Sequence, residues 1–211
     1  MDRKAISEKH LDAFKETANI GAGHAATALS TLLNKPMDMS VPQVDLVPFE
    51  EMNERLGGGE AVVVAAFLQV EGDVTGSLFF MLSLDGASSL VQELTSNLEE
   101  PLKTPPYSSM ALSAFNEVGN ILAGSYLSAL AEFTKLRLYP TVSQTVVDMA
   151  MAIVSHGLIA HSMHSDYALV IDTKMTEKGC DKNKMNGHFF FLPDPKSFQP
   201  LLQSLGVQLD G

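Results

Sequence analysis

The chain has 211 residues, of which 45% are hydrophobic and 18% charged, enough apolar material for a sizeable core and too little charge for a disordered protein. The formal net charge of −11 argues against a nucleic-acid surface, which needs clustered Lys and Arg to neutralise phosphates. Because there is no membrane-spanning apolar run, no signal-peptide pattern and only one cysteine, Cys180, we expect a soluble cytoplasmic protein that does not insert into membranes.

The first half of the chain begins with a long helix. Apolar residues recur at helical spacing from residue 11 to about Leu33, before Pro36. An extended segment is expected at 41–46, followed by a second helix at 48–56 that ends at the glycines of 57–59. The half closes with two strands joined by a turn and a final helix, expected at 60–71, 75–84 and 86–94.

The second half repeats this order. A long helix is expected at 112–133, an extended segment at 139–143 and an apolar helix at 147–154. Two strands and a closing helix follow at 167–173, 187–192 and 195–205. The halves, about 8–96 and 107–205, are separated by a proline-containing linker at 97–106. We expect an α/β fold, in which a pseudo-twofold duplicated unit forms an antiparallel or mixed sheet with the long helices on its surface.

The two long helices carry near copies of one segment. DAFKETANIGAG at 12–23 and SAFNEVGNILAG at 113–124 share seven of twelve residues at a constant offset of 101. The shared polar residues are Glu16/Glu117 and Asn19/Asn120, preceded four residues earlier by Asp12 or Ser113. Their flanks also differ, which permits unequal activity: among the differences are Lys15, Thr17 and Gly21 against Asn116, Val118 and Leu122. This duplication predicts two copies of one site.

Helical spacing of four and seven residues puts each polar set on one line along its helix, opposite the apolar face. A solvated helix face is the alternative interpretation, with Asp12 as a favourable acid near the helix start. Glu and Asn without a nucleophile make a poor self-contained catalyst, but an amide can orient a water molecule. In phosphoryl transfer, positioning a water in line is sufficient when a metal already neutralises the charge.

Small residues are frequent in both long helices, among them Gly21, Gly23 and Gly124. A glycine in a helix interior costs about 1 kcal/mol relative to alanine. Their use indicates close packing of the helices against each other or against a partner.

The pattern [D/S]xxxExxN, present twice and followed by glycine and a downstream proline, resembles the CheC/CheX/FliY family of chemotaxis phosphatases over nearly the whole chain. The two-copy arrangement is typical of CheC-type members and implies a single CheC-like domain over 1–211. The resemblance implies hydrolysis of the aspartyl phosphate of the response regulator CheY. Asn19 and Asn120 would each orient the attacking water, Glu16 and Glu117 would hold the regulator's active-site lysine, and Asp12 and Ser113 would support them.

The resemblance also implies partners and a metal. Mg²⁺ would be bound by the phosphorylated regulator, with no cofactor in this chain. The receptor deamidase CheD is a second expected partner, and the apolar segment with Asp148, Met149 and Met151 is a candidate surface for it, although a buried core helix is the alternative. Two other functions stay open: a non-catalytic adaptor that regulates CheD, and a flagellar-switch component.

Other polar residues give weaker signals. His156, His161 and His164 have spacings of five and three, which do not fit a zinc pair on a helix, so we expect no metal site. Cys180 lies in a polar loop without a catalytic partner and is interpreted as an incidental thiol.

Overall fold

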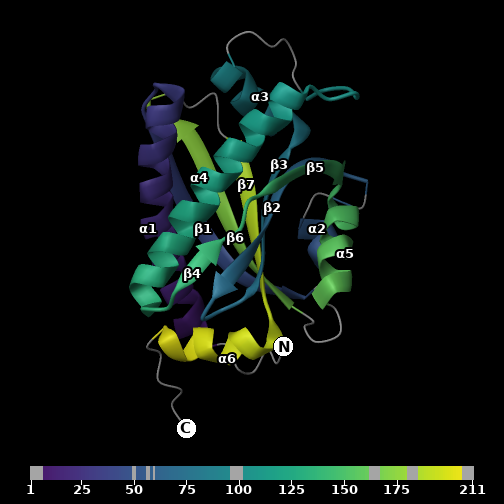
Figure 1. Ribbon diagram of the computed structural model, residues 1–211. Helices are drawn as coiled ribbons and strands as arrows, with labels where there is room; N and C mark the ends of the chain where they lie inside the picture. Colours follow the sequence, from purple (N-terminus) through teal and green to yellow (C-terminus); the bar gives the residue numbers. More distant parts are fainter. Residues whose placement is uncertain are drawn as a thin grey trace.

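The computed structural model describes residues 7–48, 51–55, 58, 60–95, 102–161, 167–179 and 185–205. Figure 1 shows helices and strands mixed along the chain, in the order α1 (Glu8–Leu33), β1 (Met37–Pro48), α2 (Met52–Arg55), β2 (Val62–Gly72), β3 (Gly76–Ser83), α3 (Leu84–Thr95), α4 (Ser109–Thr134), β4 (Leu138–Pro140), β5 (Gln144–Met149), α5 (Ala150–His161), β6 (Tyr167–Glu177), β7 (Met185–Pro193) and α6 (Pro195–Ser204). No described helix is long and apolar enough to cross a membrane. Cys180, His164, two glycines of the 57–59 turn and 97–101 of the linker lie outside the described residues, as do the side chains of His156 and His161.

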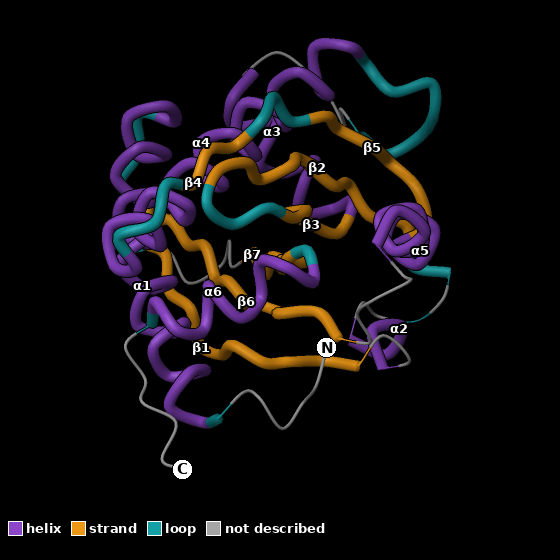
Figure 2. Tube along the Cα trace, turned by 60° about the horizontal axis from the view of Figure 1, so that its bottom comes forward, coloured by secondary structure: helices purple, strands orange, loops and turns teal. Residues whose placement is uncertain are grey.

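The seven strands of the described residues form one antiparallel sheet in which strands of the two halves are interleaved. The order is β1-β6-β7-β3-β2-β4, and β5 also pairs with β2. The strand after α1 therefore pairs with β6 of the second half, and the strands after α4 pair with β2 of the first half. The hairpins meet in the middle, where β3 pairs with β7. This arrangement confirms the expected duplicated α/β unit with an antiparallel sheet, which is strongly curled in Figure 2.

The sheet is covered by helices on both faces. One face packs against α1, α3 and α4 around Phe80, Phe115 and Phe189, each at most 1% exposed. On the other face, Phe79 and Phe190 pack with Met52 of α2 and Ile153 of α5. Alternate residues along β2 and β3 serve the two cores, as the period of a strand requires. The motif helices thus lie side by side on one face (Figure 1).

The main differences from the sequence prediction concern the segments after the long helices. The helix expected at 48–56 is reduced to the four residues of α2, since β1 continues to Pro48. The helix expected at 147–154 begins only at Ala150, because the residues before it form β5 and pair with β2. Hydrogen bonding to a neighbouring strand far away in the sequence has here overridden the local apolar pattern.

Glycines explain how closely the long helices approach their neighbours. A Cβ at Gly21 would lie 2.9 Å from the Cα of Tyr126 on α4, and one at Gly119 would collide with the Cβ of Ala66 on β2. Helix-to-helix contact is therefore confirmed at Gly21. At Gly23 and Gly124 a Cβ would meet nothing within 4 Å in the part of the chain that the structure describes, so packing against those residues does not account for them.

Candidate functional site

The two polar stripes lie on the outer surfaces of α1 and α4. Asp12, Glu16, Ser113 and Glu117 are exposed, as is Asn19, while Asn120 is half-buried. Phe14 and Phe115, from the opposite sides of the same helix turns, are 4% and 0% exposed in the core. Burial of the apolar side therefore fixes the rotation of each helix and turns the Glu/Asn pair outward.

The amide group of Asn19 is held by both polar backbone atoms of Val41. The Val41 N–H donates to Asn19 Oδ1 at 3.0 Å, and Asn19 Nδ2 donates to the carbonyl oxygens of Lys15 at 3.0 Å and Val41 at 3.5 Å. Val41 is available because the pairing of β1 with β6 shifts register between Ser40 and Gln43. With both N–H groups used, Asn19 keeps one lone pair on Oδ1 that can accept a hydrogen bond from water.

The amide group of Asn120 meets the other edge of the sheet in a similar way. Its Oδ1 accepts from the Ser143 N–H at 3.4 Å, and its Nδ2 donates to no described residue. Ser143 lies outside the strand ladder, since β4 ends at Pro140 and β5 begins at Gln144. Each asparagine therefore faces an irregular point of the sheet edge, which is a register shift in β1 at the first site and the gap between β4 and β5 at the second.

The second site has a side-chain network that the first site lacks. Asn116 Oδ1 accepts from the Ser143 hydroxyl at 2.8 Å and from the Thr145 hydroxyl at 3.1 Å. The corresponding residue of α1 is Lys15, which contributes only its carbonyl oxygen to Asn19. Sequence reasoning missed Val41, Asn116, Ser143 and Thr145, and the one available signal was the Lys15/Asn116 difference between the copies.

The start of α1 is organised by a buried histidine. The Ser7 N–H donates to His10 Nδ1 at 3.1 Å, and the Ser7 hydroxyl lies 2.8 Å from the same nitrogen. His10 is 1% exposed, and this burial lowers its pKa. A protonated ring would lose the acceptor at Nδ1, so the neutral form of His10 supports the helix start two residues before Asp12.

The candidate partner residues lie where a strand passes into a helix. Asp148 and Met149 are exposed at the end of β5, and Met151 is half-buried in α5. Ala150, Ile153 and Val154 are buried in the second core, so the start of α5 is a core element. The structure therefore leaves Asp148 and Met149 as the accessible part of this predicted surface.

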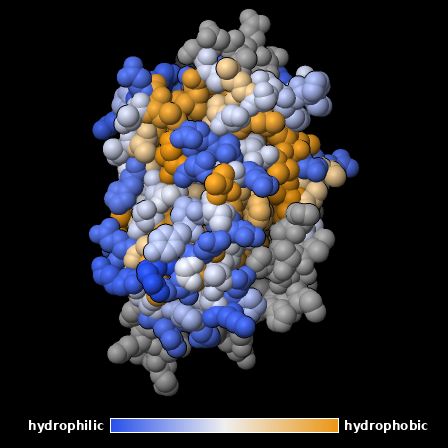
Figure 3. Space-filling view, viewed as in Figure 1, coloured by the Kyte–Doolittle hydropathy of each residue, from blue (hydrophilic) through white to orange (hydrophobic). Residues whose placement is uncertain are grey.

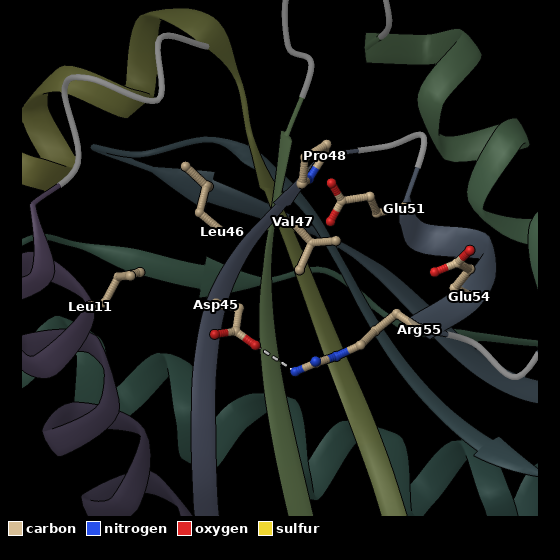
Figure 4. Close-up of a pocket in the computed structure, with 8 residues that line it drawn as sticks. All are labelled: Leu11, Asp45, Leu46, Val47, Pro48, Glu51, Glu54 and Arg55. Atoms are coloured by element: carbon tan, nitrogen blue, oxygen red, sulfur yellow. Dashed lines mark hydrogen bonds and ion pairs between the residues drawn. The ribbon is translucent and has the colours of Figure 1, made fainter.

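A hollow near the start of α1 contains none of the motif residues. Figure 4 shows Asp45 of β1 directed toward Arg55 of α2, with Glu51 and Glu54 farther along its wall. Arg55 Nη2 lies 2.5 Å from Asp45 Oδ2 and 2.7 Å from Asp172 Oδ2.

Asp172 also accepts from His188 Nδ1 at 2.8 Å. Burial raises its pKa, but the His188 bond and the Arg55 charge outweigh burial, so the net shift is downward. These ion pairs fasten α2 to the sheet, and no three His, Cys, Asp or Glu side chains of the described ranges could hold a metal ion.

The fold and the paired stripes define a class: an α/β protein with one antiparallel sheet that presents two equivalent Glu/Asn pairs on adjacent helices. The model of the CheC-like family matches residues 10–45 and 110–142, which contain both pairs. The chain is 41% identical over 204 residues to the CheY-P phosphatase CheC of Bacillus subtilis, covering 97% of each protein. The chain belongs to the CheC-like family.

Solved structures show the same fold at low sequence identity. FliY of Thermotoga maritima superposes with a TM-score of 0.77 at 15% identity, covering 95% of this chain and 98% of that one. A chain of the CheX–CheY–BeF3–magnesium complex of Borrelia burgdorferi superposes with a TM-score of 0.53 at 14% identity, covering 82% and 96%. Both comparisons support the fold described above.

Proposed function

We propose that this chain is a phosphatase that hydrolyses the aspartyl phosphate of a CheY-like response regulator by inserting its Glu/Asn pairs into the regulator's active site. The observation that carries the proposal is the position of both pairs on the outer surfaces of two long helices, where both glutamates and Asn19 are exposed and Asn120 is half-buried. Each asparagine also accepts a hydrogen bond from a backbone N–H group at an edge of the sheet. Membership of the CheC-like family and the relative named CheY-P phosphatase support the same activity.

Asn19 and Asn120 act by orienting water. Each carboxamide binds a water molecule so that the water oxygen faces phosphorus opposite the aspartyl oxygen. The new bond from water oxygen to phosphorus forms as the bond from phosphorus to the aspartyl oxygen breaks. Aspartate leaves as a carboxylate, and the protons of water pass to inorganic phosphate and solvent. An amide is not a base at neutral pH, so its contribution is placement and not proton removal.

Glu16 and Glu117 hold the regulator in register. Neither carboxylate makes an ion pair with a described residue, so both are available to a lysine of the partner. The charge-assisted hydrogen bond formed there fixes the neighbouring asparagine relative to the phosphoryl group. The metal that neutralises the phosphoryl oxygens belongs to the regulator in this proposal. Asp12 and Ser113 lie one helical turn before the glutamates and support the Glu/Asn pairs.

Phosphate release from a phosphorylated CheY-like regulator tests the proposal. We expect wild type to accelerate release and the Asn19→Ala/Asn120→Ala double variant to return the rate to that of the regulator alone. Asn186→Ala is the matched control, since it removes an exposed amide on β7 away from both helices. A double variant as fast as wild type would overturn the proposal.

A deamidase of the CheD type is a further proposed partner, binding at Asp148, Met149 and Met151. Hydrophobic side chains gather over β5 in Figure 3, where Met149 and Val146 are 45% and 40% exposed. Methionine adapts well to a partner surface. Asp148→Lys is expected to weaken deamidase binding in a pull-down titration without changing phosphate release. Unchanged affinity would remove this surface from consideration.

A further inference from the structure

Gly23 and Gly124 follow the motif asparagines by one helical turn. Each glycine is four residues after Asn19 or Asn120, on the same line as the Glu/Asn pair and about 6 Å farther along the axis. Gly23 is exposed and Gly124 is half-buried. The next residues on these lines, Thr27 and Ser128, are short and exposed. Along this line each helix therefore carries little side-chain bulk immediately after the asparagine, while Ile20 and His24 remain exposed beside the line on α1.

The chain's own packing gives no reason for these two glycines. A Cβ added at either position would meet no heavy atom of the described residues within 4 Å, whereas one at Gly21 would lie 2.9 Å from the Cα of Tyr126. Both glycines lie inside long regular helices, where only proline is less favourable. Glycine at these positions weakens both helices and is not needed to avoid a clash with the described residues. Its presence in both copies therefore indicates a contact with another molecule.

We propose that Gly23 and Gly124 are the points where the phosphorylated response regulator approaches the helix backbones most closely. This inference rests on the proposed function. The carboxamide of asparagine begins only one carbon beyond Cβ, so it reaches a phosphoryl group in a partner's active site only when the helix backbone comes close to that surface. A bare Cα one turn away gives the partner room for this approach, and continuity with the Glu/Asn pair identifies the regulator as the occupant.

Adding one methyl group at each position tests this inference. In the Gly23→Ala/Gly124→Ala variant, we expect Kd for the regulator in its beryllofluoride–Mg²⁺ form to rise about tenfold, and kcat/KM for phosphate release to fall by the same factor. The same substitutions improve helix propensity, so the unfolding midpoint is expected to rise by about 2–4 °C for each alanine. Thr27→Ala/Ser128→Ala is the matched control, with both binding and activity within about twofold of wild type.

The combination of results separates this inference from the proposed function. Higher stability with unchanged binding and activity would overturn the close-approach role. A lower unfolding midpoint would assign the glycines to the chain's own fold and would also overturn it. A wild type that binds the activated regulator without accelerating phosphate release would contradict the proposed function, while the alanine effect on Kd would still decide the role of the glycines. A wild type that does not bind would overturn both.

Discussion

At the first site, Asn19 makes three hydrogen bonds to backbone atoms of Lys15 and Val41, whereas at the second site Asn120 makes one, of 3.4 Å, to the Ser143 N–H. The first asparagine is thus held firmly with one lone pair to spare. The second donates to no described residue, and its partner Ser143 is held by a polar network around Asn116. The two copies have kept the same Glu/Asn pair and changed the way in which the asparagine is supported.

The sheet edges account for this difference. On the first edge, β1 is continuous through an irregular register and brings Val41 against α1. On the second edge, the chain is interrupted between β4 and β5, and side chains of Asn116 and Thr145 hold the interruption in place. A duplicated site can therefore preserve its reacting side chains while its supporting contacts diverge.

The largest expected effect comes from replacing the glutamates, Glu16 and Glu117, which both sites share. Loss of a buried interfacial charge pair costs about 2 kcal/mol at the lower end, so Glu16→Ala/Glu117→Ala should raise KM for the phosphorylated regulator about thirtyfold. We expect kcat at saturating regulator to change much less, because water placement by the asparagines remains. A fall in kcat with unchanged KM would contradict a docking role for the two carboxylates.

A smaller effect is expected at the network that only the second site has. Asn116→Ala removes the acceptor of two hydroxyl groups, and a lost hydrogen bond of about 1 kcal/mol corresponds to about a fivefold fall in the kcat of the second site. The measurement uses an Asn19→Ala background, so that only the second site acts. Lys15→Ala in an Asn120→Ala background is the control, with an expected change below about twofold. Equal falls in kcat for Asn116→Ala and Lys15→Ala would contradict the claim that only the second asparagine depends on a side-chain network.

The starts of the two motif helices are expected to respond differently to pH. The pKa of buried His10 is lowered in the folded state, so its contribution to stability is complete above the unfolded value of 6.5 and is lost as pH falls below it. Between pH 7.5 and pH 5.5, the protection of amides near the start of α1, corrected for the intrinsic exchange rate at each pH, should fall by about the 1 kcal/mol that a helix cap contributes. The first turn of α4 should show no such change.

His10→Gln provides the control for this effect. Glutamine at the third helical position can accept from the Ser7 N–H at every pH in this range, so the pH dependence should disappear. If the pH dependence persisted in the His10→Gln variant, a titrating group other than His10 would be its cause.

The smallest effect concerns an ion pair at the segment that follows α4. Asp73 accepts a side-chain hydrogen bond and a backbone hydrogen bond from Arg137, which lower its pKa to about 2. Because the pair is exposed, Arg137→Ala should lower the unfolding midpoint at pH 7 by less than about 2 °C. The contribution of the pair is present above pH 3.8 and lost as pH falls toward 2. An NMR titration of the variant should show the Asp73 pKa closer to its ordinary value, and a value still near 2 would contradict the pairing.

Much of the fold was predictable because local patterns and tertiary structure agree. The long helices, the two hairpins and the closing helices appear within a few residues of their expected positions. The interleaving of the halves within one sheet was not predictable in detail, since strand pairing depends on contacts between residues about a hundred positions apart. The strand at 144–149 was missed for that reason: its apolar residues suit a helix, but β2 supplies its hydrogen-bond partner.

The candidate site was predictable in its side chains and not in its supports. The spacing of Glu16 and Asn19 within a helix is enough to place them on one exposed line. Val41 and Ser143 act through backbone N–H groups, which carry no residue-specific signal in a sequence. Asn116 meets Ser143 across a distance of 27 residues, so no local pattern marks it. The assignment of Glu16, Asn19, Glu117 and Asn120 to catalysis stays a prediction.

The most direct test of the account is whether each pair acts as an independent site. Phosphate release from a saturating phosphorylated regulator would be measured with wild type, Asn19→Ala, Asn120→Ala and the double variant, after subtraction of the regulator's own rate. We expect the rates of the two single variants to add up to that of wild type and the double variant to contribute nothing. A single variant as inactive as the double, or a double variant that still accelerates release, would contradict it.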